Sequence, residues 1–259
     1  MPEQVTCSIA VVCEADTDRR AATLLCDRVL CEKVEWISPE MLPYLRRYRG
    51  LDDHESFLKW ANVKEIARRR RVIVHGFVGG EPRKPDAAMA ERALVLLAAS
   101  ETPPGAVILT RDADKDKERR AGYEQARSAQ KWPFEVVVGV AETKRECWIL
   151  AAYAPRDDAE REFLSRERKE LGFDPLSSAE LLTAGEEGAR RDAKRVLAAL
   201  MGGDWEREDA CLEERPLALL RQRGANTGLA PYLQEIEERI VPLFDPSARH
   251  GAARAAAGA

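Results

Sequence analysis

Short apolar runs alternate with helix-like segments over the first 153 residues of the chain. Ser8 to Cys13 is apolar and rich in β-branched residues, which predicts a buried strand, and apolar residues recur at helical spacing from Asp18 to Leu30. The same pattern predicts strands at 72–78, 106–110 and 134–140 and helices at 56–67, 86–99, 117–130 and 144–153. Strands that are apolar throughout and lead into helices are typical of a parallel sheet covered on both faces. We therefore expect an α/β fold with a mainly parallel sheet and crossover helices.

The pattern changes after Pro155. Residues 156–170 alternate in charge and hold few apolar positions, which is typical of a solvated helix face. Helical periodicity resumes over 179–244, interrupted by Gly and Pro. We therefore expect an α/β domain at 1–154 and a helical C-terminal part at 155–244, and the small and polar residues at 245–259 predict a disordered tail.

The charge balance limits the classes of function. The chain has 259 residues, with 41 Lys and Arg against 45 Asp and Glu, so its net charge is −4. Because 45% of its residues are hydrophobic and 33% are charged, it is too apolar for a disordered chain. The balance also argues against a protein coated in basic surface for non-specific nucleic-acid binding. Any contact with nucleic acid would then need a local basic patch or bound cations.

The sequence also indicates a compartment. No apolar run reaches the ~20 residues that span a bilayer, and the first residues lack the basic segment of a signal peptide. We therefore expect a cytoplasmic protein that does not enter a membrane. Its six cysteines form no C-x-x-C pair, which favours reduced thiols over disulfides or a zinc site.

Acidic residues follow three of the predicted strands. The first group is Glu14, Asp16 and Asp18, the second is Asp112, Asp114 and Asp116, and the third is Glu142 and Glu146. In α/β sheets ligands bind beyond the carboxyl ends of the strands, so we expect these groups to converge at one edge of the sheet. A divalent cation would offset their repulsion, and carboxylate ligands suit Mg²⁺ or Mn²⁺. In the alternative interpretation, Asp18 and Asp116 only cap helices.

Glu146 differs from the other acids in its surroundings. It opens a predicted helix that is otherwise apolar, and Cys147 and Trp148 follow it. A nearly buried carboxylate needs a partner, so we expect Glu146 to belong to the site. Glu142 lies one turn earlier, and a solvent-exposed position is an equal alternative for it.

Three motifs together resemble the Toprim superfamily, the domain shared by topoisomerases, bacterial primases and OLD-type nucleases. The segment Val11-Val-Cys-Glu14-Ala15 is similar to the family's strand that ends in Glu-Gly, although Ala15 stands where Gly is usual. Leu109-Thr-Arg-Asp112-Ala-Asp114 is similar to the later strand that ends in D-x-D. The segment that begins Glu146-Cys-Trp148 resembles one in an uncharacterised Toprim-like bacterial family found near ATPase genes in defence loci.

The resemblance implies divalent-metal-dependent hydrolysis of phosphodiesters. By that comparison, Mg²⁺ or Mn²⁺ is held by Glu14, Asp112, Asp114 and Asp116, and the catalytic set is Glu14, Asp112, Asp114 and Glu146. It further implies a nuclease in bacterial anti-phage defence, with DNA as the expected substrate and an ATPase as partner protein. Two alternatives stay open: a non-catalytic Toprim-like interaction module that regulates an ATPase, and phosphoryl transfer on a small phosphate compound.

A basic run stands apart from the acids. Four arginines precede the strand predicted at 72–78 and two further cations follow it: Arg68, Arg69, Arg70, Arg71, Arg83 and Lys84. We interpret this run as a patch that follows a nucleic-acid backbone, although a solvated helix end is an equal alternative for the arginines. The chain contains neither G-x-x-x-x-G-K-[ST] nor G-x-G-x-x-G, so no motif supports ATP or dinucleotide binding.

Overall fold

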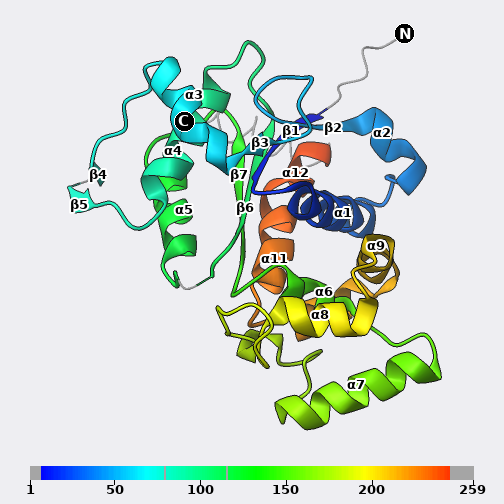
Figure 1. Cartoon of the computed structure of the whole chain (residues 1–259). Coiled ribbons are helices and arrows are strands. Elements are labelled where there is room, and N and C mark those ends of the chain that lie inside the picture. The colour runs from blue at the N-terminus through cyan, green and yellow to red at the C-terminus, as the bar shows by residue number, and fades with distance from the viewer. Residues whose placement is uncertain (1–6, 79, 115, 246–259) are drawn as a thin grey trace. The chain divides into compact units, whose positions relative to one another are not determined.

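The computed structural model describes residues 7–78, 80–114 and 116–245 and confirms the α/β fold (Figure 1). Its main sheet has the strand order β2-β1-β6-β7, with β3 also paired to β1, and helices follow in the C-terminal region. Apart from Asp245, the tail predicted at 245–259 lies outside the described residues. None of the helices in the described ranges is both long and apolar enough to cross a membrane.

The elements follow the alternation expected from the sequence. The strands are β1 (Cys7–Cys13), β2 (Arg46–Arg49), β3 (Leu58–Lys59), β4 (Phe77–Val78), β5 (Glu81–Pro82), β6 (Ala106–Asp112) and β7 (Glu135–Ala141). The first helices are α1 (Asp16–Lys33), η1 (Pro39–Met41), α2 (Leu42–Leu45), α3 (Trp60–Arg69), α4 (Ala87–Ala98), α5 (Arg119–Ser128) and α6 (Glu146–Ala152). The later ones are α7 (Asp158–Leu171), η2 (Ala179–Leu181), α8 (Ala193–Met201), α9 (Trp205–Glu214), α10 (Leu217–Arg223), α11 (Leu229–Arg239) and α12 (Val241–Phe244).

The chain packs as two compact units that interleave along the sequence. The first unit comprises the described residues of Met1–Thr110, Glu118–Val138 and Leu233–Ala259. The second comprises Gly139–Tyr232 and the described residues of Arg111–Lys117. The division predicted from the sequence, 1–154, 155–244 and 245–259, is instead consecutive along the chain.

A parallel sheet forms the core of the first unit. In β1, the residues from Ile9 to Cys13 are fully buried, and this strand pairs in parallel with β2, β3 and β6. The helices α3, α4 and α5 lie on one side of the sheet and α1 and α12 on the other (Figure 1). The chain adds β2 on one side of β1 and later β6 and β7 on the other, so the strand order reverses between β1 and β6.

The strand predicted at 72–78 is wrong in extent and in place. Only β4 is extended there, and it pairs with β5 in a separate antiparallel hairpin rather than with the main sheet. Ile73 is 79% exposed and Phe77 is 64% exposed. An apolar run becomes a sheet strand only where its backbone groups pair with a neighbouring strand, and Phe77–Val78 pair with Glu81–Pro82 instead.

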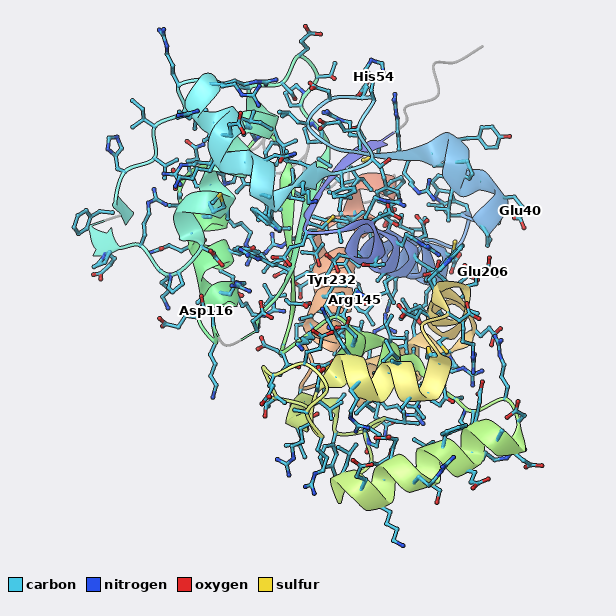
Figure 2. The ribbon with its side chains drawn as sticks, in the orientation of Figure 1. Glu40, His54, Asp116, Arg145, Glu206 and Tyr232 are labelled. Atoms are coloured by element: carbon cyan, nitrogen blue, oxygen red, sulfur yellow. The ribbon has the colours of Figure 1, made fainter. Side chains whose placement is uncertain are left out.

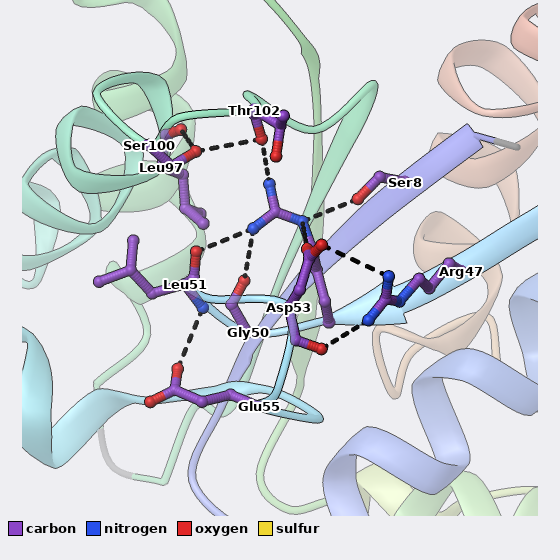
Figure 3. Close-up of polar contacts among 10 residues, drawn as sticks. Ser8, Arg47, Gly50, Leu51, Asp53, Glu55, Leu97, Ser100 and Thr102 are labelled. Atoms are coloured by element: carbon purple, nitrogen blue, oxygen red, sulfur yellow. Dashed lines mark hydrogen bonds and ion pairs between the residues drawn. The ribbon is translucent and has the colours of Figure 1, made fainter.

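The strand β2 was not predicted, because its sequence Arg-Arg-Tyr-Arg contains no apolar run. Its last residue, Arg49, is only 2% exposed. Figure 3 shows the polar groups of this region, among them Ser8, Leu51 and Thr102. The Nε of Arg49 donates to Ser8 Oγ at 2.8 Å, its Nη1 to the carbonyl of Leu51 at 2.8 Å, and its Nη2 to the carbonyl of Thr102. This buried cation joins β1, β2 and the loop before β6.

The buried helix α6 is the centre of the second unit. All seven of its residues are buried, and it packs against η2, α8, α9 and α10. Trp148 donates from Nε1 to the carbonyl of Thr227 at 2.8 Å and stacks on Tyr232, with ring centroids 5.1 Å apart. Gly228 has φ +80°, and a Cβ there would lie 2.1 Å from the carbonyl oxygen of Val140, so only glycine fits.

Candidate functional site

Asp112 joins the end of β6 to the start of α6 within the second unit. The residue is half-buried, and its Oδ1 accepts a hydrogen bond of 2.7 Å from the backbone N–H of Arg145. Such an N–H at a helix start has no partner inside the helix, and a carboxylate is a strong acceptor for it. Of the acids predicted after the strands, the structure therefore brings Asp112 next to the segment that carries Glu146.

Two residues beyond the strand ends have left-handed backbone conformations. Asp114 has φ +51° and Thr143 has φ +70°, and the N–H of Asp114 donates to the carbonyl of Thr143 at 2.9 Å. Positive φ is uncommon for any residue with a Cβ and is an outlier for a β-branched one such as Thr143. Residues held in this way cost of order 1–3 kcal/mol each and occur often at functional sites.

The backbone of Asp114 gives a stability prediction. We expect Asp114→Gly to unfold with a free energy about 1–2 kcal/mol higher than that of Asp114→Ala, because only glycine adopts positive φ without a steric cost. In an ordinary helix or strand the order of these two substitutions is reversed. Urea unfolding of the two variants measures the difference. An alanine variant as stable as the glycine variant would contradict the positive φ of residue 114.

Glu146 is a buried carboxylate with an unused oxygen. The residue is 8% exposed, and its Oε2 has no hydrogen-bond partner among the described residues. Its other oxygen, Oε1, lies 3.6 Å from Nη2 of the Arg145 guanidinium. A buried carboxylate oxygen without a partner carries a large desolvation cost, which a proton, a water molecule or a cation would relieve.

Two cations beside Glu146 are held by acids from later helices. Lys144 Nζ lies 2.9 Å from Oδ1 of Asp192, which caps α8, and Arg145 Nη1 lies 2.8 Å from Oε2 of Glu208 on α9. Neither of these two ion pairs was predicted from the sequence. Their partners lie 48 and 63 positions further along the chain, so no local spacing could have indicated them.

The pair Lys144–Asp192 predicts a dependence of stability on pH. Burial by itself raises the pKa of the Asp192 carboxyl, but hydrogen bonds from Lys144 and from the N–H groups of Gly188 and Lys194 outweigh it and hold that pKa below its usual value. A lowered folded-state pKa stabilises the protein above the ordinary Asp pKa of about 4, and this contribution is lost as the pH falls through the folded value.

We therefore expect Asp192→Asn to lower the free energy of unfolding by about 2 kcal/mol at pH 7, because it removes a charged acceptor from a residue that is 1% exposed. The difference from the wild type should shrink below about pH 4, where Asp192 takes up its proton. Unfolding in urea across this range measures it, with Asp158→Asn on the exposed surface of α7 as control. A difference that stayed constant with pH would contradict the ionised pair.

The first acidic group lies in the first unit, and two of its members have local roles. Asp18 Oδ2 accepts from the N–H of Ala15 at 3.0 Å, and Asp16 Oδ1 accepts from Arg19 Nε at 2.7 Å. The capping alternative is thus confirmed for Asp18. Glu14 follows β1 directly and is half-buried.

The remaining acids of the second unit lie in different surroundings. Asp114 is exposed and Glu142 is half-buried, with its N–H bonded to the carbonyl of Thr227 at 2.9 Å. Figure 2 shows Asp116 apart from Arg145, which belongs to the same unit. The structure therefore does not bring Asp116 to the contact between Asp112 and Arg145.

The predicted metal ligands are carboxylates, and their chemistry suits a divalent cation. Carboxylates are the oxygen donors that Mg²⁺ and Mn²⁺ prefer, and the unused oxygen of Glu146 is one that a cation would satisfy. Within residues 7–78, 80–114 and 116–245, however, no three or more His, Cys, Asp or Glu side chains are grouped so as to hold a metal ion.

The basic residues divide into two kinds. Arg68 to Arg71 are exposed at the end of α3, where Arg69 forms an ion pair of 3.2 Å with Glu65. Arg83 is mostly buried and forms an ion pair with Glu91 on α4. Its guanidinium is therefore bound within the first unit and does not form part of an exposed basic patch. Lys84 is exposed, and its Nζ lies 3.9 Å from Glu118.

Comparison of the chain with protein-family models, with curated proteins and with solved structures found no match. The Toprim resemblance therefore stays a prediction from the three motifs. The site of the second unit has three features. Asp112 accepts the N–H of Arg145 at the start of α6, Glu146, which follows Arg145, is buried, and Asp114 has a left-handed backbone.

Proposed function

We propose that this protein is a Toprim-like nuclease that hydrolyses nucleic-acid phosphodiesters with the help of Mg²⁺ or Mn²⁺. The observation that carries the proposal is the buried Oε2 of Glu146, which has no hydrogen-bond partner in the described part of the chain. Structural carboxylates that are nine-tenths buried are normally satisfied within the protein. An unused one beside a strained backbone segment is typical of a group that acts on a ligand.

Each acid has a distinct role in the proposed reaction. Asp112 and Asp114 would hold the cation, which would supply charge stabilisation to the phosphate under attack, and Glu14 is a ligand by the resemblance alone. Glu146 accepts the proton of the attacking water at Oε2, because that oxygen is not engaged by another donor among the described residues. The hydrogen bond from Arg145 to Asp112 fixes the orientation of the carboxylate in this scheme.

The proposal is tested by a cleavage assay with plasmid, linear duplex, single-stranded DNA and RNA in the presence of Mg²⁺ or Mn²⁺. Wild type is compared with Glu14→Gln, Asp112→Asn and Glu146→Gln, and Asp158→Asn serves as control because its side chain is fully solvated on α7. Wild-type cleavage that all three site variants retained would overturn the proposal.

One observation favours a second function, a non-catalytic interaction module that regulates an ATPase partner. Lys144 and Arg145 already form ion pairs with Asp192 and Glu208, so this segment is charge-compensated by the protein itself. Titration calorimetry separates the two functions. A nuclease binds Mn²⁺ and loses that binding in Asp112→Asn, whereas a module of this kind shows neither metal-dependent cleavage nor a change in Mn²⁺ binding in that variant.

A further inference from the structure

A hairpin arm extends from the first unit between α3 and α4. We define the arm as the described residues 72–78 and 80–85. The strands β4 and β5 form its antiparallel part, and it projects away from α3 and α4 in Figure 1. Ile73 and Phe77 on this arm are the two most exposed large hydrophobic residues of the described chain. Exposed apolar side chains that gather in one place, surrounded by polar groups, often mark a binding surface.

The base of the arm is fixed to the helices beneath it. Gln125 on α5 accepts from the N–H of Lys84 at 2.9 Å and donates to the carbonyl of Pro82 at 3.1 Å. The N–H of Arg83 donates to the carbonyl of Gly76 at 3.2 Å, which joins the two limbs, and the Arg83 side chain forms its ion pair with Glu91. The base of the arm is thus held in a defined place, although Ile73 and Phe77 are exposed.

Glycine at position 122 shows how closely the arm approaches α5. A Cβ on Gly122 would lie 1.8 Å from the carbonyl oxygen of Pro85, the last residue of the arm. Any other residue would force the arm away from α5, since real side chains do not come so close to a backbone oxygen. The sequence of α5 therefore accommodates the arm specifically.

The charge around the arm differs in sign from that of the rest of the chain. Residues 64–84 contain seven Lys or Arg and two Glu, a net charge of +5, so the remaining residues carry −9 of the chain's total of −4. The four arginines from Arg68 to Arg71 are all exposed. A segment of this charge is complementary to a polyanion.

We propose that the arm binds single-stranded nucleic acid, with the ring of Phe77 stacked on an unpaired base and the arginines of 68–71 on the adjoining phosphates. This inference rests on the proposed function, because it names the form of the substrate. Exposed aromatic rings beside a basic track are the combination by which proteins bind single strands, since every unpaired base offers a face for stacking. A paired base in a duplex does not offer that face, so the arm discriminates between the two forms.

The test measures binding without cleavage. Fluorescence anisotropy with a labelled 20-nucleotide oligothymidine, in EDTA, compares wild type with Phe77→Ala and Phe77→Trp. We expect Phe77→Ala to weaken binding about tenfold and Phe77→Trp to bind as well as wild type, while binding of a blunt duplex of the same length is equal in all three. The control is Phe163→Ala on α7, an exposed ring under Arg166 that lies outside the arm, and it should bind like wild type.

A second variant tests the phosphate contacts. Arg70→Gln combined with Arg71→Gln should lower the slope of log affinity against log salt by about 1–2, since fewer counterions are released. Two results would overturn the proposal that the arm binds single strands. One is equal binding of oligothymidine by wild type and Phe77→Ala, and the other is a loss of duplex binding in Phe77→Ala as large as its loss of oligothymidine binding. Binding of anionic phospholipid vesicles that Phe77→Ala abolished, with oligonucleotide binding intact, would also overturn it. Because EDTA removes divalent metal from the assay, these outcomes do not depend on whether the acidic residues catalyse cleavage.

Discussion

Replacing Glu146 by Gln is expected to lower the rate of nucleic-acid cleavage by at least about 100-fold and to raise the free energy of unfolding by about 1 kcal/mol. The two changes have one cause. Glutamine has the size of glutamate and fills the same volume at the start of α6, but it carries no charge to desolvate and cannot accept the proton of the attacking water. A residue retained for function at the expense of stability responds in this opposed way.

Single-turnover cleavage with Mn²⁺ and urea unfolding measure the two effects on the same preparation. Asp112→Asn should also lose at least about 100-fold in cleavage, but without the gain in stability, because its amide can accept the N–H of Arg145 less strongly than a carboxylate does. Glu142→Gln is the matched control, since Glu142 is half-buried and opens no helix. A Glu146→Gln protein that was less stable than wild type would show that the carboxylate is satisfied in the folded chain and would contradict the proposed role.

The strands of the main sheet that could be predicted are those whose pattern is local. β1, β6 and β7 are continuous apolar runs buried on both faces, and the structure has each within two residues of the expected bounds. β2 could not be predicted from such a pattern, since its side chains are Arg and Tyr. It is recognisable only through partners far along the chain, such as Asp27, which accepts two hydrogen bonds from Arg46 and one from Tyr48.

The places of the site's acids in the strands and helices could be predicted, but their contacts could not. The position of Asp112 at a strand end and of Glu146 at a helix start follows from apolar periodicity, and the burial of Glu146 is confirmed. The left-handed conformations of Asp114 and Thr143 were not predicted, because Asp adopts positive φ only occasionally and a β-branched residue such as Thr rarely does. The engagement of Arg83 by Glu91 was likewise hidden, since a charged loop residue normally lies in water.

The buried Arg49 gives the largest expected effect on stability. Arg49→Met should lower the free energy of unfolding by about 3–5 kcal/mol, because it leaves the Leu51 and Thr102 carbonyls and the Ser8 hydroxyl without their donor. Arg49→Lys keeps the charge, but one ammonium group cannot reach three acceptors that a planar guanidinium spans, so about 2 kcal/mol should still be lost. The lysine variant also keeps the measurement interpretable if the methionine variant does not fold.

Arg47 provides the control for this prediction, because it lies on the same strand, two residues before Arg49, and bonds to Asp53 at the surface. Arg47→Met should change the free energy of unfolding by no more than about 1 kcal/mol, as for an exposed ion pair. Urea unfolding of the three variants gives the comparison, with an unchanged denaturant slope showing that the unfolded state is the same. A loss in Arg49→Met no larger than that in Arg47→Met would mean that water replaces the guanidinium and that the joint between β1, β2 and the loop before β6 does not depend on it.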